Sequence, residues 1–217
     1  MWIHLLTDPT HHVPMQWAWM DPLLVAISVI VAVCSASMAL HMAGLARKAR
    51  RATTRNLAQA SGACCLGGGI WSMHFIGMLA FTPCANGSFS TLLSTLSALP
   101  SLLAAAWVMR ALQRPAPWPR LLLSGSLFGA GVAAMHFGGM AASDAASSIR
   151  YAPLGLLLAV VVGVGLATAG LALHQRLLQA GVRLRTTTML SGALLGLSVS
   201  GMHYAAMGAI HWPVGDT

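Results

Sequence analysis

The sequence predicts an all-α membrane protein: a polytopic bundle of six transmembrane helices built from three two-helix repeats, with both termini on the outer side. Three observations support this prediction. Hydrophobic residues make up 57% of the 217 residues and charged residues only 7%, whereas a soluble domain has about 25% charged residues. Six long apolar runs follow one another along the chain, and one motif recurs in every second run. A lipid bilayer is therefore the expected solvent of most of the chain.

Each apolar run is long enough for one transmembrane helix, which needs about 20 apolar residues. Pro22 and Pro153 fall in the first turn of their runs, where a missing N–H costs little. Pro100 lies inside the third run, so we expect a kink there. The sixth run spans the membrane only if its polar Thr, Ser and His residues are tolerated. The expected helices cover residues 22–46, 57–82, 89–112, 121–142, 152–174 and 187–210.

The charged residues determine the expected orientation. The loops after the first, third and fifth runs hold 11 of the 12 basic residues, and all four acidic residues lie on the opposite side. Basic loops of multi-pass proteins face the cytoplasm, so we expect these loops inside a bacterial inner (plasma) membrane and both termini outside. The net charge of +8 then requires no nucleic-acid partner. The expected parts are an outer segment (1–21), a membrane domain (22–212) and an outer tail (213–217).

A Met-His-aromatic-x-x-Met motif occurs three times, in the second, fourth and sixth runs. Residues four apart share a helix face, so each His lies one turn from the second Met of its motif. The first Met is rotated about 100° from the His and flanks that face. Each His lies about 10 Å below the outer end of its helix, so all three are expected at one depth. The motifs are Met73-His74-Phe75-Ile76-Gly77-Met78, Met135-His136-Phe137-Gly138-Gly139-Met140 and Met202-His203-Tyr204-Ala205-Ala206-Met207.

Small residues precede each motif at matching positions, which indicates a helical hairpin of about 65 residues used three times. A glycine stands six residues before the first Met in every copy, at Gly67, Gly129 and Gly196. Small side chains allow helix backbones to approach closely. We therefore expect the three motif-bearing helices to form an inner ring, with the other three helices packed around them.

Three histidines and six methionines at a common depth predict a metal site. Mixed thioether and imidazole ligands favour copper, above all Cu(I), while zinc usually recruits cysteine, histidine or carboxylate. Haem stays open, because His/His and His/Met pairs both serve as axial ligands. A purely packing role is also open, although repetition in alternate helices argues against it. The expected metal ligands are Met73, His74, Met78, Met135, His136, Met140, Met202, His203 and Met207.

The remaining histidines and the cysteines carry weaker signals. His41 and His174 lie near the inner helix ends, where packing or capping is expected. The cysteines form no expected disulfide within the chain, although the Cys64-Cys65 pair near the inner side is a candidate metal entry or exit point. Neither an acid–base dyad nor a nucleophile with a partner base is found, so no enzyme activity is expected. The outer-side histidines, expected to be solvated loop residues, are His4, His11, His12 and His211.

Three such motifs on alternate helices of a six-helix membrane unit resemble the bacterial MHYT domain, an integral membrane sensor domain. The third copy, Met202-His203-Tyr204, is nearest to the motif of the family name, with Ala205 in place of the threonine. The resemblance covers roughly residues 20–212. It implies that the nine motif methionines and histidines bind copper, and that the domain detects oxygen, carbon monoxide or nitric oxide.

Members of this family often continue into cytoplasmic GGDEF, EAL or histidine-kinase domains, whereas this chain stops at Thr217. We therefore expect a stand-alone form that passes its signal to a separate cytoplasmic or membrane partner. Two other roles stay open: copper transport or delivery, and a haem-binding redox function.

Overall fold

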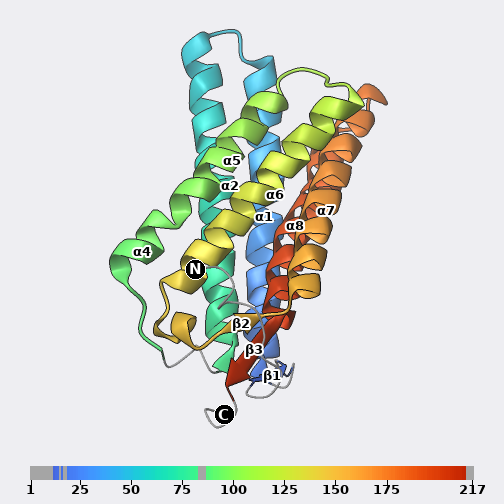
Figure 1. Ribbon diagram of the computed structural model, residues 1–217. Helices are drawn as coiled ribbons and strands as arrows, with labels where there is room; N and C mark the ends of the chain where they lie inside the picture. Colours follow the sequence, from blue (N-terminus) through green and yellow to red (C-terminus); the bar gives the residue numbers. More distant parts are fainter. Residues whose placement is uncertain (1–11, 15, 17–18, 83–86, 214–217) are drawn as a thin grey trace.

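Seven α-helices make up most of the described part of the chain. The computed structural model describes residues 12–14, 16, 19–82 and 87–213 (Figure 1). Their order along the chain is α1 (Pro22–Lys48), α2 (Ala52–Ala80), α4 (Thr91–Leu96), α5 (Ala98–Ala111), α6 (Trp118–Ala141), α7 (Pro153–Gln179) and α8 (Leu184–Gly208).

Five helical segments are long and apolar enough to cross a membrane, counting α4 and α5 together as one. The sixth segment, α8, which carries the third motif, is 25 residues long but is not one of the five. Its buried Thr, Ser and His side chains lower its hydropathy. The structure therefore supports a multi-pass membrane protein and confirms the helical fold class. The five segments are Pro22–Lys48, Ala52–Ala80, Thr91–Ala111, Trp118–Ala141 and Pro153–Gln179.

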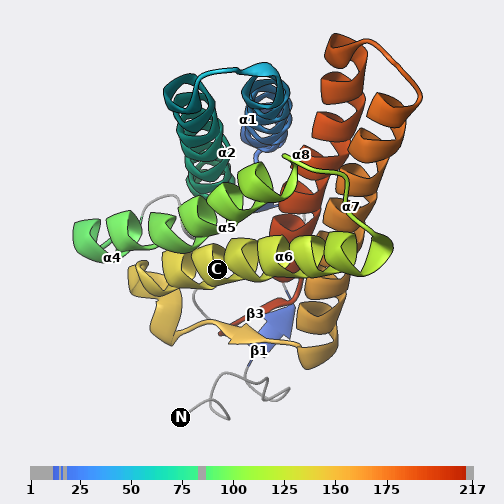
Figure 2. The same ribbon diagram turned by 90° about the horizontal axis from the view of Figure 1, so that it is seen from above.

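The long helices form a closed ring, which Figure 2 shows from above. Each helix packs on the next in the order α1, α2, α5, α6, α7 and α8, and α8 returns to pack on α1. The motif-bearing helices α2, α6 and α8 also contact one another inside the ring. In Figure 1, α5 and α6 are tilted relative to α1 and α2. The expected inner set of motif helices is confirmed, and it has an approximate threefold arrangement.

The glycine that precedes each motif lies where two helices meet. A Cβ atom on Gly196 would lie 2.6 Å from the Val33 Cα, and one on Gly67 would lie 2.8 Å from the Leu102 Cα. Such distances leave no room for a side chain, so glycine is required for these backbones to touch. Each contact joins a motif helix to the helix that follows it in the ring. The three pairs are Gly67 with Leu102 in α5, Gly129 with Val164 in α7, and Gly196 with Val33 in α1.

Prolines and one aspartate define where several helices begin or break. Pro22 and Pro153 are the first residues of α1 and α7, as expected. The Asp21 carboxylate caps α1 by accepting from two backbone N–H groups of its first turn. The kink expected from Pro100 occurs at Ser97, between α4 and α5. A proline removes the hydrogen bond to the residue four positions earlier, so the break lies in the preceding turn.

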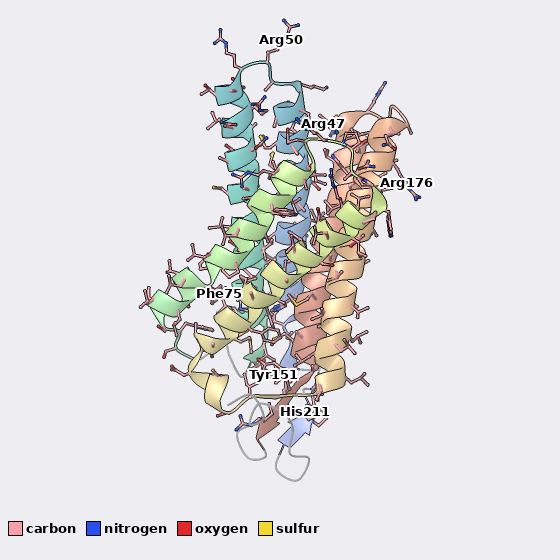
Figure 3. All side chains as sticks on the ribbon, turned by 45° about the horizontal axis from the view of Figure 1, so that its top comes forward. Arg47, Arg50, Phe75, Tyr151, Arg176 and His211 are labelled. Carbon is pink, nitrogen blue, oxygen red and sulfur yellow. The ribbon has the colours of Figure 1, made fainter. Side chains whose placement is uncertain are left out.

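A small antiparallel sheet, which the sequence did not indicate, joins the two ends of the described chain. Its strands are β1 (His12–Pro14), β2 (Arg150–Tyr151) and β3 (Ile210–Pro213), in the order β1-β3-β2. Figure 3 shows His211 and Tyr151 at this end of the bundle, and Arg47, Arg50 and Arg176 at the opposite end. We refer to these as the sheet end and the basic end. Both described chain ends therefore lie at the sheet end.

Candidate metal centre

The three motif histidines meet at the centre of the bundle. His74 in α2, His136 in α6 and His203 in α8 are each at most 1% exposed. Their Nδ1 atoms form a nearly equilateral triangle, with separations of 3.2 Å for His74–His203, 3.2 Å for His136–His74 and 3.1 Å for His136–His203. The expected common depth is thereby borne out for all three side chains.

The Nε2 atoms of His203 and His74 point away from this centre, each toward a neighbouring motif helix. His203 Nε2 lies against Gly77 and His74 Nε2 against Gly139, so closely that a Cβ on either glycine would overlap the ring. Both glycines stand three residues after the His of their own motif. The Met-His-aromatic-x-x-Met motif leaves this position unspecified, and the third copy has an alanine there, Ala206. Gly77 and Gly139 thus make room for the histidine of the adjacent motif helix.

Aromatic rings support each histidine from the side. The motif aromatic residue makes an edge-to-face contact with the preceding imidazole, at centroid distances of 5.0 Å for Phe75, 5.0 Å for Phe137 and 4.8 Å for Tyr204. The imidazoles also meet one another edge to face, at 5.0 to 5.2 Å. Tyr204 is further fixed by a 2.6 Å hydrogen bond between its hydroxyl and that of Ser28 in α1. The ring orientations are thus determined by packing.

The electrostatics of this arrangement favour a cation. A neutral imidazole carries one N–H, and its other nitrogen presents a lone pair. If the protons are on Nε2, three Nδ1 lone pairs face one another inside an apolar core, which is repulsive without a positive charge between them. The centre of a triangle with sides of 3.2 Å lies about 1.8 Å from each corner. An ion slightly out of this plane would reach the 2.0–2.1 Å that is typical of metal–imidazole bonds.

The six motif methionines are all buried and lie on both sides of the histidine layer. The first Met of each motif belongs to the large apolar cluster that extends toward the basic end. The second belongs to a smaller cluster near the sheet end, together with Met20 and Phe81. Thioethers are thus available above and below the three imidazoles. The two sets are Met73, Met135 and Met202, and Met78, Met140 and Met207.

The other histidines lie apart from this centre. His174 is buried near the basic end of α7, and His41 is half-buried in α1. His211 is half-buried in β3, where its Nδ1 lies 3.3 Å from the Ala209 carbonyl oxygen. His12 pairs through its backbone in β1, while His4 and His11 lie outside the described residues.

The cysteines do not extend the centre. Cys34 and Cys64 are exposed on the outside of the bundle, and the Cys65 thiol lies 3.7 Å from the Ser35 carbonyl oxygen. Cys84 lies outside the described residues. Within the described part of the chain, the three histidines are the single group of at least three His, Cys, Asp or Glu residues close enough to share an ion.

Comparison with known proteins places these features in a family. The model of the MHYT family, described as a bacterial signalling protein N-terminal repeat, matches residues 67–125 and 129–190. Each match therefore begins at a glycine of a helix contact described above, Gly67 or Gly129. No solved structure matches the chain.

Several bacterial proteins match this chain over part of a longer sequence. The chain is 39% identical over 201 residues to the Pseudomonas aeruginosa bifunctional diguanylate cyclase/cyclic di-GMP phosphodiesterase MucR, covering 90% of this chain and 29% of that protein. It is 32% identical to the cyclic di-GMP phosphodiesterase NbdA of the same organism, covering 88% of this chain and 24% of NbdA. Signaling protein YkoW of Bacillus subtilis is 28% identical, covering 67% of this chain and 18% of YkoW. The chain thus spans less than a third of these relatives, and by its repeats and its similarity to them it belongs to the MHYT family of bacterial signalling proteins.

Proposed function

We propose that the chain is an integral membrane sensory protein that holds a copper ion at His74, His136 and His203. The observation that carries the proposal is the convergence of three Nδ1 atoms within 3.2 Å of one another in a fully buried layer. Histidine in an apolar membrane core is costly, and the cost rises further when the protons are on Nε2 and the three Nδ1 lone pairs face one another. A bound cation would offset this cost.

The ligand chemistry favours copper. Imidazole suits several transition metals, but buried thioethers on both sides of the histidine layer select soft ions such as Cu(I). We propose the three histidines as the main ligands and the six motif methionines as the candidate sulfur ligands. Both described carboxylates, Asp21 and Asp144, belong to the sheet end, away from the histidine layer. A bound copper ion would supply a coordination position for a diatomic gas such as oxygen, carbon monoxide or nitric oxide.

The geometry favours a single ion over the two alternatives. Three imidazoles whose Nδ1 atoms nearly touch leave no space between them for a porphyrin ring, which argues against haem. A transport route would require further ligands along the path, whereas Cys34 and Cys64 lie on the outer surface of the bundle. Both features support a static binding site.

The relatives support a signalling role for this chain rather than a catalytic one. MucR and NbdA are named for making or degrading cyclic di-GMP, and the chain covers 29% and 24% of their lengths. We propose that a change at the metal centre alters helix packing and is passed to a separate signalling partner, with cyclic di-GMP turnover as its class of output. The chain itself would be non-catalytic.

The membrane orientation is part of the same proposal. We propose that α8 spans the bilayer as the sixth helix, because it packs on α1 and α7 along the ring. The basic end would face the cytoplasm of a bacterial inner membrane, and the sheet end would face outward. The metal centre would then lie in the outer half of the membrane.

Metal analysis of the purified protein tests the proposal. After loading under reducing conditions, we expect about one copper per chain in the wild type and at least tenfold weaker binding in His136→Ala, since one of three ligands is lost. His41→Ala, which removes a half-buried histidine outside the cluster, is the matched control and should bind as the wild type does.

Equal copper content in His136→Ala and His41→Ala would contradict the proposal, as would a wild type that binds no copper under either reducing or oxidising loading. An absorption spectrum of the same samples distinguishes haem, which gives an intense Soret band. Uptake of copper into proteoliposomes would instead favour the transport alternative.

A further inference from the structure

A cavity opens at the basic end of the bundle, remote from the histidine layer. It has a volume of about 150 Å³ and lies between α1, α5, α6, α7 and the loop that joins α5 to α6. Buried leucines form its floor, while Arg47 and Arg114 are exposed and therefore lie at its mouth. The cavity thus combines an apolar interior with a cationic entrance.

His174 lines this cavity and has no partner for either ring nitrogen. Its side chain is 1% exposed, and both Nδ1 and Nε2 are buried without a hydrogen bond. A buried polar group without a partner costs free energy that a bound ligand can recover. An N–H of the ring is therefore available to an acceptor placed in the cavity.

Among the described residues, no acidic side chain lies at this end to neutralise the arginines. The described carboxylates, Asp21 and Asp144, both belong to the sheet end. Two adjoining depressions share lining residues with the cavity and add Arg110, Arg120 and Lys48. The positive charge around the mouth therefore lacks a counter-charge from the described part of the protein.

The cavity wall is fixed by a pair of hydrogen bonds between elements. The Gln175 side chain in α7 donates from Nε2 to the Ala116 carbonyl oxygen at 3.0 Å and accepts at Oε1 from the Ala116 N–H at 2.8 Å. These two bonds attach the loop that carries Arg114 to α7. The mouth is consequently held in place next to His174.

We propose that this cavity binds a phosphate group, with Arg47 and Arg114 contacting its oxygens at the mouth and His174 donating from the floor. Guanidinium groups pair with phosphate oxygens in a planar, bidentate manner. The phosphate can come from an anionic phospholipid headgroup at the adjacent membrane surface or from a soluble phosphate compound. Basic pockets between helices at a membrane interface are suited to such headgroups. The site does not depend on the metal centre.

The test compares two double variants with the same loss of charge. Arg47→Gln/Arg114→Gln removes both arginines at the mouth, whereas Arg55→Gln/Arg185→Gln removes two exposed arginines of the same end that do not line the cavity. One arm measures retention of phosphatidylglycerol against phosphatidylcholine by native mass spectrometry. The other measures stabilisation by inorganic phosphate against thermal unfolding in phosphatidylcholine nanodiscs.

We expect Arg47→Gln/Arg114→Gln, the mouth variant, to bind either phosphatidylglycerol or inorganic phosphate at least tenfold more weakly than its control does, because two charge-assisted contacts are lost. A difference in the lipid arm alone assigns the phosphate to a headgroup, and a difference in the inorganic phosphate arm assigns it to a soluble compound. His174→Leu provides a second variant without loss of a permanent charge, and we expect severalfold weaker binding in the same arm. Equal binding by the mouth variant, its control and His174→Leu in both arms would overturn the proposal.

Discussion

Three imidazole nitrogens that converge in an apolar core form an arrangement that is unfavourable by itself. Each Nδ1 of His74, His136 and His203 faces two others, and none of the Nε2 atoms has a hydrogen-bond partner. A buried polar group without a partner costs about 1–3 kcal/mol. Packing of the motif aromatics and of the neighbouring glycines holds the rings in place against this cost. An ion between the rings would therefore stabilise the folded bundle as well as occupy the site.

Room for the His203 and His74 rings depends on single glycines, Gly77 and Gly139, and Gly139→Ala tests this. The added Cβ would overlap His74 Nε2, so we expect weaker copper binding and a loss of about 1–3 kcal/mol in the free energy of unfolding. Gly138→Ala is the control, because its Cβ would meet the Ser97 side chain only at 3.4 Å. Copper analysis and thermal unfolding provide the measurements. Equal behaviour of the two variants would refute a steric role for Gly139.

The convergence of the histidines could be predicted from the sequence, whereas the roles of Gly77 and Gly139 could not. Three motifs at equal depth in alternate helices leave few other ways to place three polar side chains. Each glycine, in contrast, accommodates a ring from a different helix. Which helix supplies that imidazole depends on the order of the helices in the bundle, and the hydrophobic pattern of one helix does not reveal this order. The methionines could be placed near the histidine layer, and their role as ligands stays a prediction.

The apolar runs of the sequence predict which segments are helices, but not the residues at which each helix begins and ends. α2 begins at Ala52 instead of residue 57, and α7 continues to Gln179 instead of residue 174. Arginine and glutamine are good helix formers, so a helix continues past the apolar part of its sequence into polar surroundings. The three short strands were not expected, because four or fewer residues show no readable alternation. The break near Pro100 could be predicted because proline acts locally.

Contacts between helices depend on the repeated glycines, and two adjacent positions in α2 allow a matched comparison. A Cβ on Gly67 would lie 2.8 Å from the Leu102 backbone, whereas one on Gly68 would meet nothing within 4 Å. We expect Gly67→Ala to lower the free energy of unfolding by about 1–3 kcal/mol. Gly68→Ala should be neutral, or stabilising by up to about 1 kcal/mol, through its helix propensity. Circular dichroism during thermal unfolding measures both. A Gly68→Ala protein as unstable as Gly67→Ala would show that helix contact is not the cause.

For the whole molecule, the distribution of charge predicts how the bundle lies in the membrane. In a background where the four native cysteines are replaced by serine, we expect Arg50→Cys to resist an impermeant maleimide on intact cells and to react after permeabilisation. His211→Cys, at the sheet end, should react on intact cells. Labelling in the reverse order would show that the basic end faces outward, and the proposed position of the metal centre would change accordingly.

Closure of the ring by α8 and α1 has a further consequence for how the chain is divided. The regions matched by the family begin within a motif helix and run through the next helix of the ring. If each hairpin consists of a motif helix and the next helix of the ring, two hairpins are continuous in sequence: α2 with α5, and α6 with α7. The third hairpin is split, because α8 lies near one end of the chain and α1 near the other. The pairing of β1 with β3 rejoins the split hairpin. The bundle can therefore be understood as a trimer of hairpins fused into one polypeptide, whose subunit order a circular permutation would leave intact.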